Sequence, residues 1–350
     1  MEDKIRVLVV DDAGVMRRAV SDILNSDPMI EVVGDAKNGL LGLEKAKELK
    51  PDVITLDMDM PVMNGISTTR HVMIKCQIPI VVLSSLFTDG AVTFEALRLG
   101  VVDFVPKPSG AVSRDLNEGR ERIIERVKMA ASVNVDNIRR AKLPIFAADE
   151  AGAAGGGAAP EALVLMGTNL CGPNTVIRTM AHMMRMPQTS IIVIQSISNK
   201  ILPSFVEEFD KFVSWRIKAL QEDTIIEPGV CYIGSNENSL VLDHIGDEKY
   251  AVMVGEAVDK PIDMLYNSAA ESFDGFIAGV LLGGIGDDGA MGLANIREYG
   301  GVTMAHDNHY CVFPNLTENA IQQQVVDRVV NDHAIPGAIL ETVRGHLHMA

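Results

Sequence analysis

One run of small residues divides the 350-residue chain into two parts. Residues 151–160 read AGAAGGGAAP, which is glycine and alanine with no periodic apolar pattern. Such a run is typical of a flexible tether between domains. A chain of this length also exceeds what one hydrophobic core usually serves. We therefore expect domains at residues 1–127 and 162–350, joined by a linker at 128–161 that starts as a charged helical connector running toward Arg140.

Short apolar runs alternate with amphipathic helical segments on both sides of the tether. Before it, the strand candidates are IRVLVV, DVITLD, IPIVVLS and VVDFVPK; after it, they are ALVLMG, SIIVIQS, VCYIGS, KYAVMV and GFIAGVLLGG. Alternation of strands and helices predicts a parallel sheet with helices on both faces. The expected fold class is therefore α/β, with two doubly wound parallel-sheet domains.

Charge and composition exclude several classes of protein. The net charge of −16 disfavours binding to nucleic acid or anionic lipid, because both would repel the chain. No apolar run approaches the roughly 20 residues that a membrane span needs, and the start MEDKIRVLVVDD has no signal-peptide layout. The four cysteines are too widely spaced for a disulfide framework or a zinc knuckle. We expect a cytoplasmic protein with reduced thiols, no membrane insertion and no nucleic-acid partner.

Polar side chains follow four of the predicted strands of the first domain. Asp11 and Asp12 come directly after IRVLVV, Asp57 ends DVITLD, Ser84 ends IPIVVLS and Lys107 ends VVDFVPK. The carboxyl ends of parallel strands meet at one edge, which is where open α/β sheets place their functional crevice. Three carboxylates crowded there favour a cation, and hard oxygen ligands suit Mg²⁺. A carboxylate held in such a site can accept a phosphoryl group.

The segments VVDDAGVMRR, LDMDMPVMNG, VLSS and DFVPKP, within residues 4–127, resemble the response-regulator receiver domain. That domain has a flavodoxin-like fold. The resemblance implies that Asp11 and Asp12 coordinate Mg²⁺, that Asp57 is the phosphoacceptor and a further ligand, and that a backbone carbonyl at Asp59 completes the protein ligands. It implies no organic cofactor, and a histidine kinase of the chemotaxis type as phosphodonor.

The same resemblance assigns the switch residues. It makes Ser84 the switch hydroxyl, Phe104 the aromatic switch and Lys107 the partner of the phosphoryl oxygens, ahead of a cis peptide bond to Pro108. Phosphorylation would then move the loop that follows the fourth strand, because the new negative oxygens recruit the lysine and the hydroxyl.

The second domain resembles the CheB family, chemotaxis response regulators that are protein-glutamate methylesterases. The resemblance rests on GTNLCGPNTVI, VIQS, KPIDMLYNSAAE and LLGGIGDDGAMGL. Family motifs of the form G-A-S-T-G-G-P, V-V-Q-H-M and G-M-G-x-D-G-A supply a serine nucleophile, a histidine base and an orienting aspartate. On this chain those three positions are Asn169, Ser196 and Asp288, so only the aspartate is kept. The resemblance also implies the cytoplasmic region of a chemoreceptor as a partner.

Two functional hypotheses follow from these departures. The amide of Asn169 does not attack an ester, and Ser196 cannot accept a proton as imidazole does. Loss of a triad typically removes about 10⁴ to 10⁶ of the rate. The first hypothesis is therefore a phosphorylation-controlled regulatory or binding module without esterase activity. The alternative is an active methylesterase or protein-glutamine deamidase with a rearranged site, in which Cys171 would be the nucleophile and His306 or His309 a candidate base.

Overall fold

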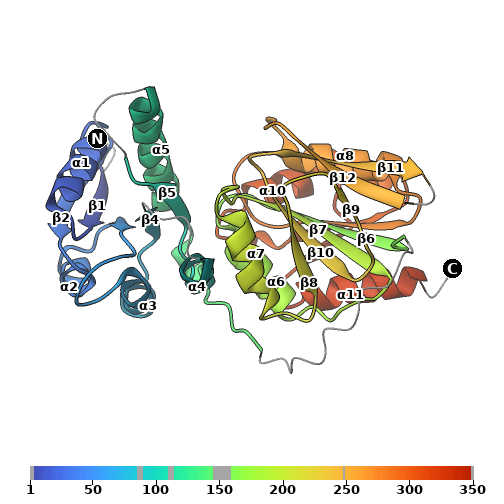
Figure 1. Cartoon of the computed structure of the whole chain (residues 1–350), viewed down its shortest axis with the longest axis horizontal. Coiled ribbons are helices and arrows are strands. Elements are labelled where there is room, and N and C mark those ends of the chain that lie inside the picture. The colour runs from blue at the N-terminus through green and yellow to red at the C-terminus, as the bar shows by residue number, and fades with distance from the viewer. Residues whose placement is uncertain (1–3, 85–89, 109–113, 145–158, 247–248, 348–350) are drawn as a thin grey trace. The chain divides into compact units, whose positions relative to one another are not determined.

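The chain forms two compact units, Met1–Arg140 and Ala141–Ala350. The computed structural model describes residues 4–84, 90–108, 114–144, 159–246 and 249–347 (Figure 1). Most of the predicted tether, and the loop at residues 85–89 that phosphorylation was expected to move, therefore lie outside the described residues.

The first unit is a five-stranded sheet in which all neighbouring strands run parallel. Its strands are β1 (Ile5–Val10), β2 (Ile30–Ala36), β3 (Val53–Leu56), β4 (Ile80–Ser84) and β5 (Asp103–Pro106), in the order β2-β1-β3-β4-β5. Its helices are α1 (Gly14–Asn25), α2 (Gly39–Leu49), α3 (Gly65–Lys75), α4 (Gly90–Leu99) and α5 (Arg114–Ala131). This is the doubly wound sheet that the alternation of strands and helices predicted.

Side-chain caps fix where two helices begin. The Asn38 side chain accepts a hydrogen bond from the Leu41 N–H at the start of α2, and the Asn64 side chain accepts one from the Ser67 N–H at the start of α3. Each cap satisfies a donor that has no partner within the helix. Gly65 permits the close approach of α3 to the end of β3, since a Cβ there would lie 2.5 Å from the backbone oxygen of Asp57.

The prediction of a helical connector running toward Arg140 is wrong. Helix α5 ends at Ala131, and a short 3₁₀ turn follows at Val135–Asn137. Val133 is β-branched and Asn134 is an asparagine, and both residue types have low helix propensity, which favours the end of the helix at this point. Val133 is buried, so the residues that follow α5 still pack against the protein interior.

The second unit contains a seven-stranded parallel sheet and a separate three-stranded antiparallel sheet. The parallel strands are β6 (Ala162–Gly167), β7 (Thr189–Gln195), β8 (Arg216–Leu220), β10 (Val230–Ser235), β13 (Phe276–Leu281), β14 (Val302–His306) and β15 (Arg328–Val330), in the order β15-β14-β13-β6-β7-β10-β8. The antiparallel strands are β9 (Thr224–Ile225), β11 (Ser239–Gly246) and β12 (Lys249–Gly255). The run KYAVMV belongs to β12, and its prediction as part of the parallel layer is corrected.

In the part of this unit that the structure describes, six α-helices accompany these sheets. They are α6 (Gly172–Ala181), α7 (Leu202–Asp210), α8 (Pro261–Ser272), α9 (Ala290–Glu298), α10 (Asn315–Gln322) and α11 (Ile335–Leu347). Helix α8 packs closely on the β6–β13 pair: the Tyr266 hydroxyl donates to the Val280 carbonyl over 2.7 Å. A Cβ on Gly167 would lie 2.4 Å from the Ile262 side chain, so glycine is required where β6 ends.

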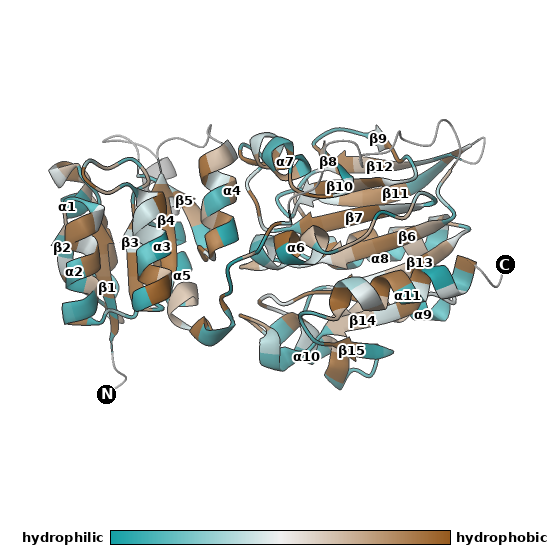
Figure 2. Cartoon of the chain, turned by 90° about the horizontal axis from the view of Figure 1, so that it is seen from below, coloured by the Kyte–Doolittle hydropathy of each residue, from teal (hydrophilic) through white to brown (hydrophobic). Residues whose placement is uncertain are grey.

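Hydrophobic residues concentrate on the strands of both parallel sheets, while hydrophilic residues gather on the helices (Figure 2). Every residue of β6 and β7 is buried, which explains why these strands read as continuous apolar runs. Within the described residues, none of the helices combines the length and the apolar character needed to cross a membrane.

Candidate functional sites at the two sheet edges

An acidic cluster lies at the carboxyl edge of the first sheet. Asp11 and Asp12 follow β1 directly and Asp57 follows β3, its neighbour in the sheet. One carboxylate oxygen from each of the three lies within 4.8 Å of the others. Asp11 and Asp57 are buried, whereas Asp12 is exposed at the rim. The structure therefore brings together the three carboxylates that the strand ends predicted.

Lys107 bridges the two buried carboxylates. Its Nζ lies 2.7 Å from Asp11 Oδ2 and 2.8 Å from Asp57 Oδ2. Burial raises the pKa of Asp57 above its usual value, although the hydrogen bond from Lys107 acts in the opposite direction. Burial also works to lower the pKa of Lys107, but its hydrogen bonds to the two carboxylates outweigh burial and raise it. The ammonium thus stays charged beside a carboxylate that is poorly solvated.

The remaining predicted residues of the first unit lie at or near the same edge. Ser84 is the buried last residue of β4, and its carbonyl accepts a hydrogen bond from the Lys107 N–H over 3.1 Å. Phe104 lies in β5 and packs against the core. Asp59 is exposed, and the N–H that donates to the Asp57 carboxylate, over 2.8 Å, is that of Met58. The predicted cis bond before Pro108 is wrong, because the described residues contain no cis peptide. The trans form of such a bond is favoured by only about 0.5–1 kcal/mol, so the residue pair alone does not decide the isomer.

At the carboxyl edge of the second sheet, the Asn169 side chain links two loops by hydrogen bonds. Its Oδ1 accepts hydrogen bonds from the N–H of Leu170 over 2.7 Å and of Ile285 over 2.8 Å. Its Nδ2 donates to the Ile285 carbonyl over 2.7 Å. The fit is close, since a Cβ on Gly284 would lie 2.2 Å from Asn169 Oδ1. The side chain at the nucleophile position therefore joins the turn after β6 to the loop after β13.

The Asp288 side chain also forms hydrogen bonds with the backbone of a neighbouring segment. Its carboxylate oxygens accept hydrogen bonds from the N–H groups of Ile262 over 2.9 Å and of Asp263 over 2.8 Å. Both donors lie in the first turn of α8, so Asp288 caps that helix as well as belonging to its glycine-rich loop. Burial raises the pKa of Asp288 to about 6, and the backbone hydrogen bonds oppose this rise.

A pocket of about 360 Å³ opens beside these two side chains. Asn169 and Asp288 line it together with Asn236, which lies outside the quoted motifs, and Lys260, which begins the KPIDMLYNSAAE segment but was given no role there. Among the described residues that line this pocket there is no histidine, and Ser196, which follows β7 directly, is not part of the lining. A search for amide and cationic residues just beyond other strand ends would have found Asn236 but not Lys260.

The three residues proposed for a rearranged catalytic site lie in environments that differ from this pocket. Cys171 is buried, and it precedes α6 with a left-handed φ of 61°. His306 is buried with its Nε2 3.5 Å from Asp332 Oδ1, and Asp332 is also paired with Arg178. His309 has a side chain that is 90% exposed. The structure thus places His306 in a buried ionic cluster and His309 in solvent.

Comparisons with known proteins match both units. The family profile described as CheB methylesterase matches residues 164–339, and the profile described as response regulator receiver domain matches residues 7–114. A protein-glutamate methylesterase/protein-glutamine glutaminase of Caldanaerobacter subterraneus subsp. tengcongensis is 32% identical over 98% of this chain and 98% of its own length. One of the same name from Methanococcus maripaludis is 33% identical over 97% of this chain and 98% of its own length.

Among solved structures, the response regulator domain of Thermotoga maritima CheB is 46% identical, covering 37% of this chain and 98% of that chain with a TM-score of 0.35. A receiver fold with an acidic edge, followed by a methylesterase-type α/β unit, defines a two-domain response regulator. The chain belongs to the CheB family. The resemblance and the fold class inferred from the sequence are both confirmed.

Proposed function

We propose that this protein is a response regulator of chemotaxis-type signalling that is phosphorylated on Asp57 by a chemotaxis-type histidine kinase. The observation that carries the proposal is the convergence of Asp11, Asp12 and Asp57 within 4.8 Å, with the Lys107 ammonium bridging two of them. In the transfer, an Asp57 carboxylate oxygen forms the new bond to phosphorus. The bond from phosphorus to the donor breaks, and its electron pair leaves with the donor.

The residues present fit a divalent cation. Three carboxylates can offer oxygen ligands at one point, and Mg²⁺ prefers such ligands. Asp11, Asp12 and Asp57, with the backbone carbonyl of Asp59, would hold the ion. When bound, it supplies positive charge that offsets the negative charge of the carboxylates and the phosphoryl oxygens. Lys107 contributes an ammonium to the same oxygens; no organic cofactor is proposed.

Ser84, Phe104 and Lys107 are proposed to respond to the phosphoryl group. Ser84 ends β4 and Lys107 follows β5, so a hydroxyl and an ammonium stand at neighbouring strand ends. The hydroxyl donates to a phosphoryl oxygen and Lys107 pairs with another, which changes the conformation near Phe104 and controls the second domain.

For the second domain we infer recognition without ester hydrolysis. Asn169 lacks a nucleophilic oxygen, and its amide is occupied by three backbone hydrogen bonds. Asp288 holds the start of α8 rather than an imidazole. The pocket beside them would bind the cytoplasmic region of a chemoreceptor, the partner expected from the family, without removing a methyl ester.

The relatives favour the alternative function. Full-length relatives are named protein-glutamate methylesterase/protein-glutamine glutaminase, and no comparison supports a loss of activity. An active enzyme would need a nucleophile other than Asn169, and Cys171 is the nearest candidate in the sequence. The comparisons therefore argue for an enzyme, whereas the side chains at the triad positions argue for a binding domain.

The cellular location follows from the same proposal. A kinase phosphodonor and the cytoplasmic region of a receptor both require a cytoplasmic protein. Within the described residues, the cysteines Cys76, Cys171, Cys231 and Cys311 form no disulfide, which fits a reducing compartment.

Acetyl phosphate provides the test of the phosphoacceptor. Incubation of the full chain with acetyl phosphate and Mg²⁺ should add one phosphoryl group at Asp57, detected by intact-mass measurement and peptide mapping. A chain that stays unmodified under conditions that label a competent receiver would refute the proposal. Ester hydrolysis that is abolished by Cys171→Ser would instead establish the alternative.

A further inference from the structure

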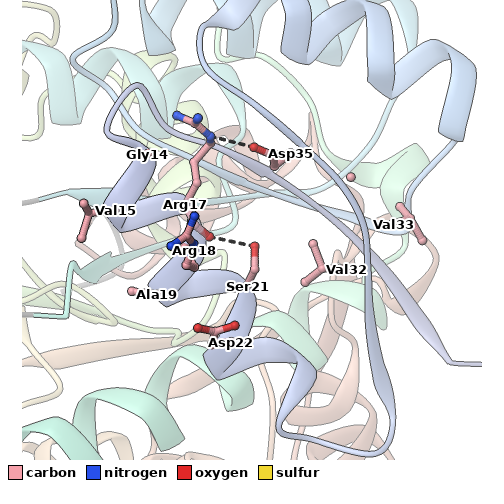
Figure 3. A pocket seen from close by; sticks show the side chains of 11 residues that line it. Gly14, Val15, Arg17, Arg18, Ala19, Ser21, Asp22, Val32, Val33 and Asp35 are labelled. Carbon is pink, nitrogen blue, oxygen red and sulfur yellow. Dashed lines mark hydrogen bonds and ion pairs between the residues drawn. The ribbon is translucent and has the colours of Figure 1, made fainter.

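Arg17 lies on α1, at a groove between that helix and the edge strand β2 (Figure 3). The groove is also lined by Arg18, Asp22 and Asp35. Figure 3 shows the Arg17 side chain extended toward Asp35, and its second dashed line joins the Ser21 hydroxyl to the backbone carbonyl of Arg17. Arg18 is exposed. Two adjacent arginines therefore border one groove in different environments.

The guanidinium of Arg17 makes three contacts. Its Nε lies 2.7 Å from Asp35 Oδ2. Its Nη1 donates to the backbone carbonyl of Asp11 over 2.9 Å and to that of Asp12 over 3.0 Å. One planar group thus joins the end of β2 to the turn between β1 and α1. Asp35 forms a direct ion pair with Arg17, so it fixes the direction of the guanidinium.

That turn carries two of the three clustered carboxylates. The Asp11 carboxylate has other restraints, because its Oδ1 accepts from the Ala13 N–H over 2.9 Å and its Oδ2 contacts Lys107. Asp12 is exposed at the rim of the cluster. Where its carboxylate points therefore depends on the backbone that Arg17 holds.

We propose that Arg17 is a positioning residue for the cation site: it fixes the Asp11–Asp12 turn through both carbonyls, and Asp35 in turn fixes Arg17. The inference rests on the Mg²⁺ site of the proposed function. Residues that orient metal ligands in this way typically change metal affinity by about 10- to 100-fold when they are substituted.

Charge and positioning predict opposite effects at this residue. A cation near the cluster repels Mg²⁺, so removal of its charge alone would tighten Mg²⁺ binding. Removal of a group that positions the ligands would weaken binding. Arg17→Lys separates the charge effect from the positioning effect further. Lysine keeps the positive charge but lacks the planar guanidinium that contacts both carbonyls and Asp35 at once. Arg18→Ala is the matched control, since it removes the same charge from the adjacent residue of the same groove.

The experiment measures Mg²⁺ binding to the full chain by isothermal titration calorimetry, together with the rate of phosphorylation by acetyl phosphate across a range of Mg²⁺ concentrations. Arg17→Ala should raise the dissociation constant for Mg²⁺ about 10- to 100-fold. It should raise the half-saturating Mg²⁺ concentration in parallel and leave the rate at saturating Mg²⁺ within about twofold. Arg17→Lys and Asp35→Asn should weaken binding by smaller factors, and Arg18→Ala should leave it unchanged or slightly tighter.

Circular dichroism of each variant shows whether the fold is retained, and the charge-conserving Arg17→Lys keeps the test valid if Arg17→Ala unfolds. Binding that is equal or tighter in both Arg17 variants overturns the inference and leaves the proposed function in place. A lower rate at saturating Mg²⁺ with unchanged half-saturation also overturns it. If the unsubstituted chain neither binds Mg²⁺ nor accepts phosphate, the proposed function fails and the inference fails with it.

Discussion

The carboxyl edges of the two parallel sheets use the same kind of polar residue for different purposes. In the first sheet, Asp11 and Asp57 converge with Lys107 on one point, where a ligand can meet them. In the second sheet, Asn169 and Asp288 direct their polar atoms to the backbone of neighbouring loops. The difference shows that the chemistry open to a sheet edge depends on which polar atoms remain available there.

The largest expected effect concerns the nucleophile of the first edge. Asp57→Asn should reduce labelling by acetyl phosphate by about 10³-fold or more, because an amide does not attack phosphorus as a carboxylate does. Intact-mass measurement gives the labelled fraction. Asp59→Asn is the control: Asp59 is exposed, and its proposed contribution comes from the backbone, so labelling should persist. Equal labelling of Asp57→Asn and the unsubstituted chain would contradict the assignment.

Lys107→Met tests whether charge balance stabilises the first edge. In EDTA the substitution should destabilise the first unit by about 3 kcal/mol, since it leaves two buried carboxylates without their cation. Added Mg²⁺ should recover more stability in Lys107→Met than in the unsubstituted chain, as the ion replaces the lost charge. Urea unfolding followed by circular dichroism measures both. Lys75→Met, at an exposed lysine, should change stability by less than about 0.5 kcal/mol.

Asn169→Ala tests the structural role at the second edge. It removes three hydrogen bonds and should destabilise the second unit by about 2–3 kcal/mol, at about 1 kcal/mol for each bond. The single tryptophan, Trp215, is buried in that unit, so its fluorescence during urea unfolding reports on the second unit alone. An unchanged unfolding midpoint would show that Asn169 does not hold the two loops together.

The smallest expected effect is the pH dependence that Asp288 confers. Its pKa is about 6 in the folded chain against an ordinary value of 3.8, so the folded state binds more protons between these pH values. The stability of the second unit should therefore fall as the pH rises from about 4 to above 6, by about 1 kcal/mol after allowance for partial exposure. Asp288→Asn should flatten this slope in Trp215 fluorescence experiments. A slope that is the same in both proteins would contradict the prediction.

The sequence predicted most residues at the carboxyl edge of the first sheet, because each of them is marked by the residues directly before it. The strands before Asp11 and Asp57 are short apolar runs, and the functional residue comes directly after each run. Strand β2 was not identified from its own residues because its exposed polar positions break the apolar pattern. The helical connector was predicted wrongly for a related reason, since the charge pattern beyond Ala131 did not reveal that α5 ends there.

The second edge could be predicted only in part. The motif resemblance assigned Asn169 to the nucleophile position, but its partner Ile285 lies 116 residues away, and such a contact has no local signal. Arg17 escaped notice because VVDDAGVMRR contains two adjacent arginines, and only the structure shows that one of them reaches the backbone of the acidic turn.

The proposed function has a phosphorylatable first domain that controls a second domain without esterase activity. Methanol release from a methylated chemoreceptor, measured with the chain phosphorylated on Asp57, tests it most directly. We predict release below about 10⁻³ of the rate of a competent family member, as expected for a site without its triad. Release that approaches the competent rate would contradict the account and establish the protein as a methylesterase.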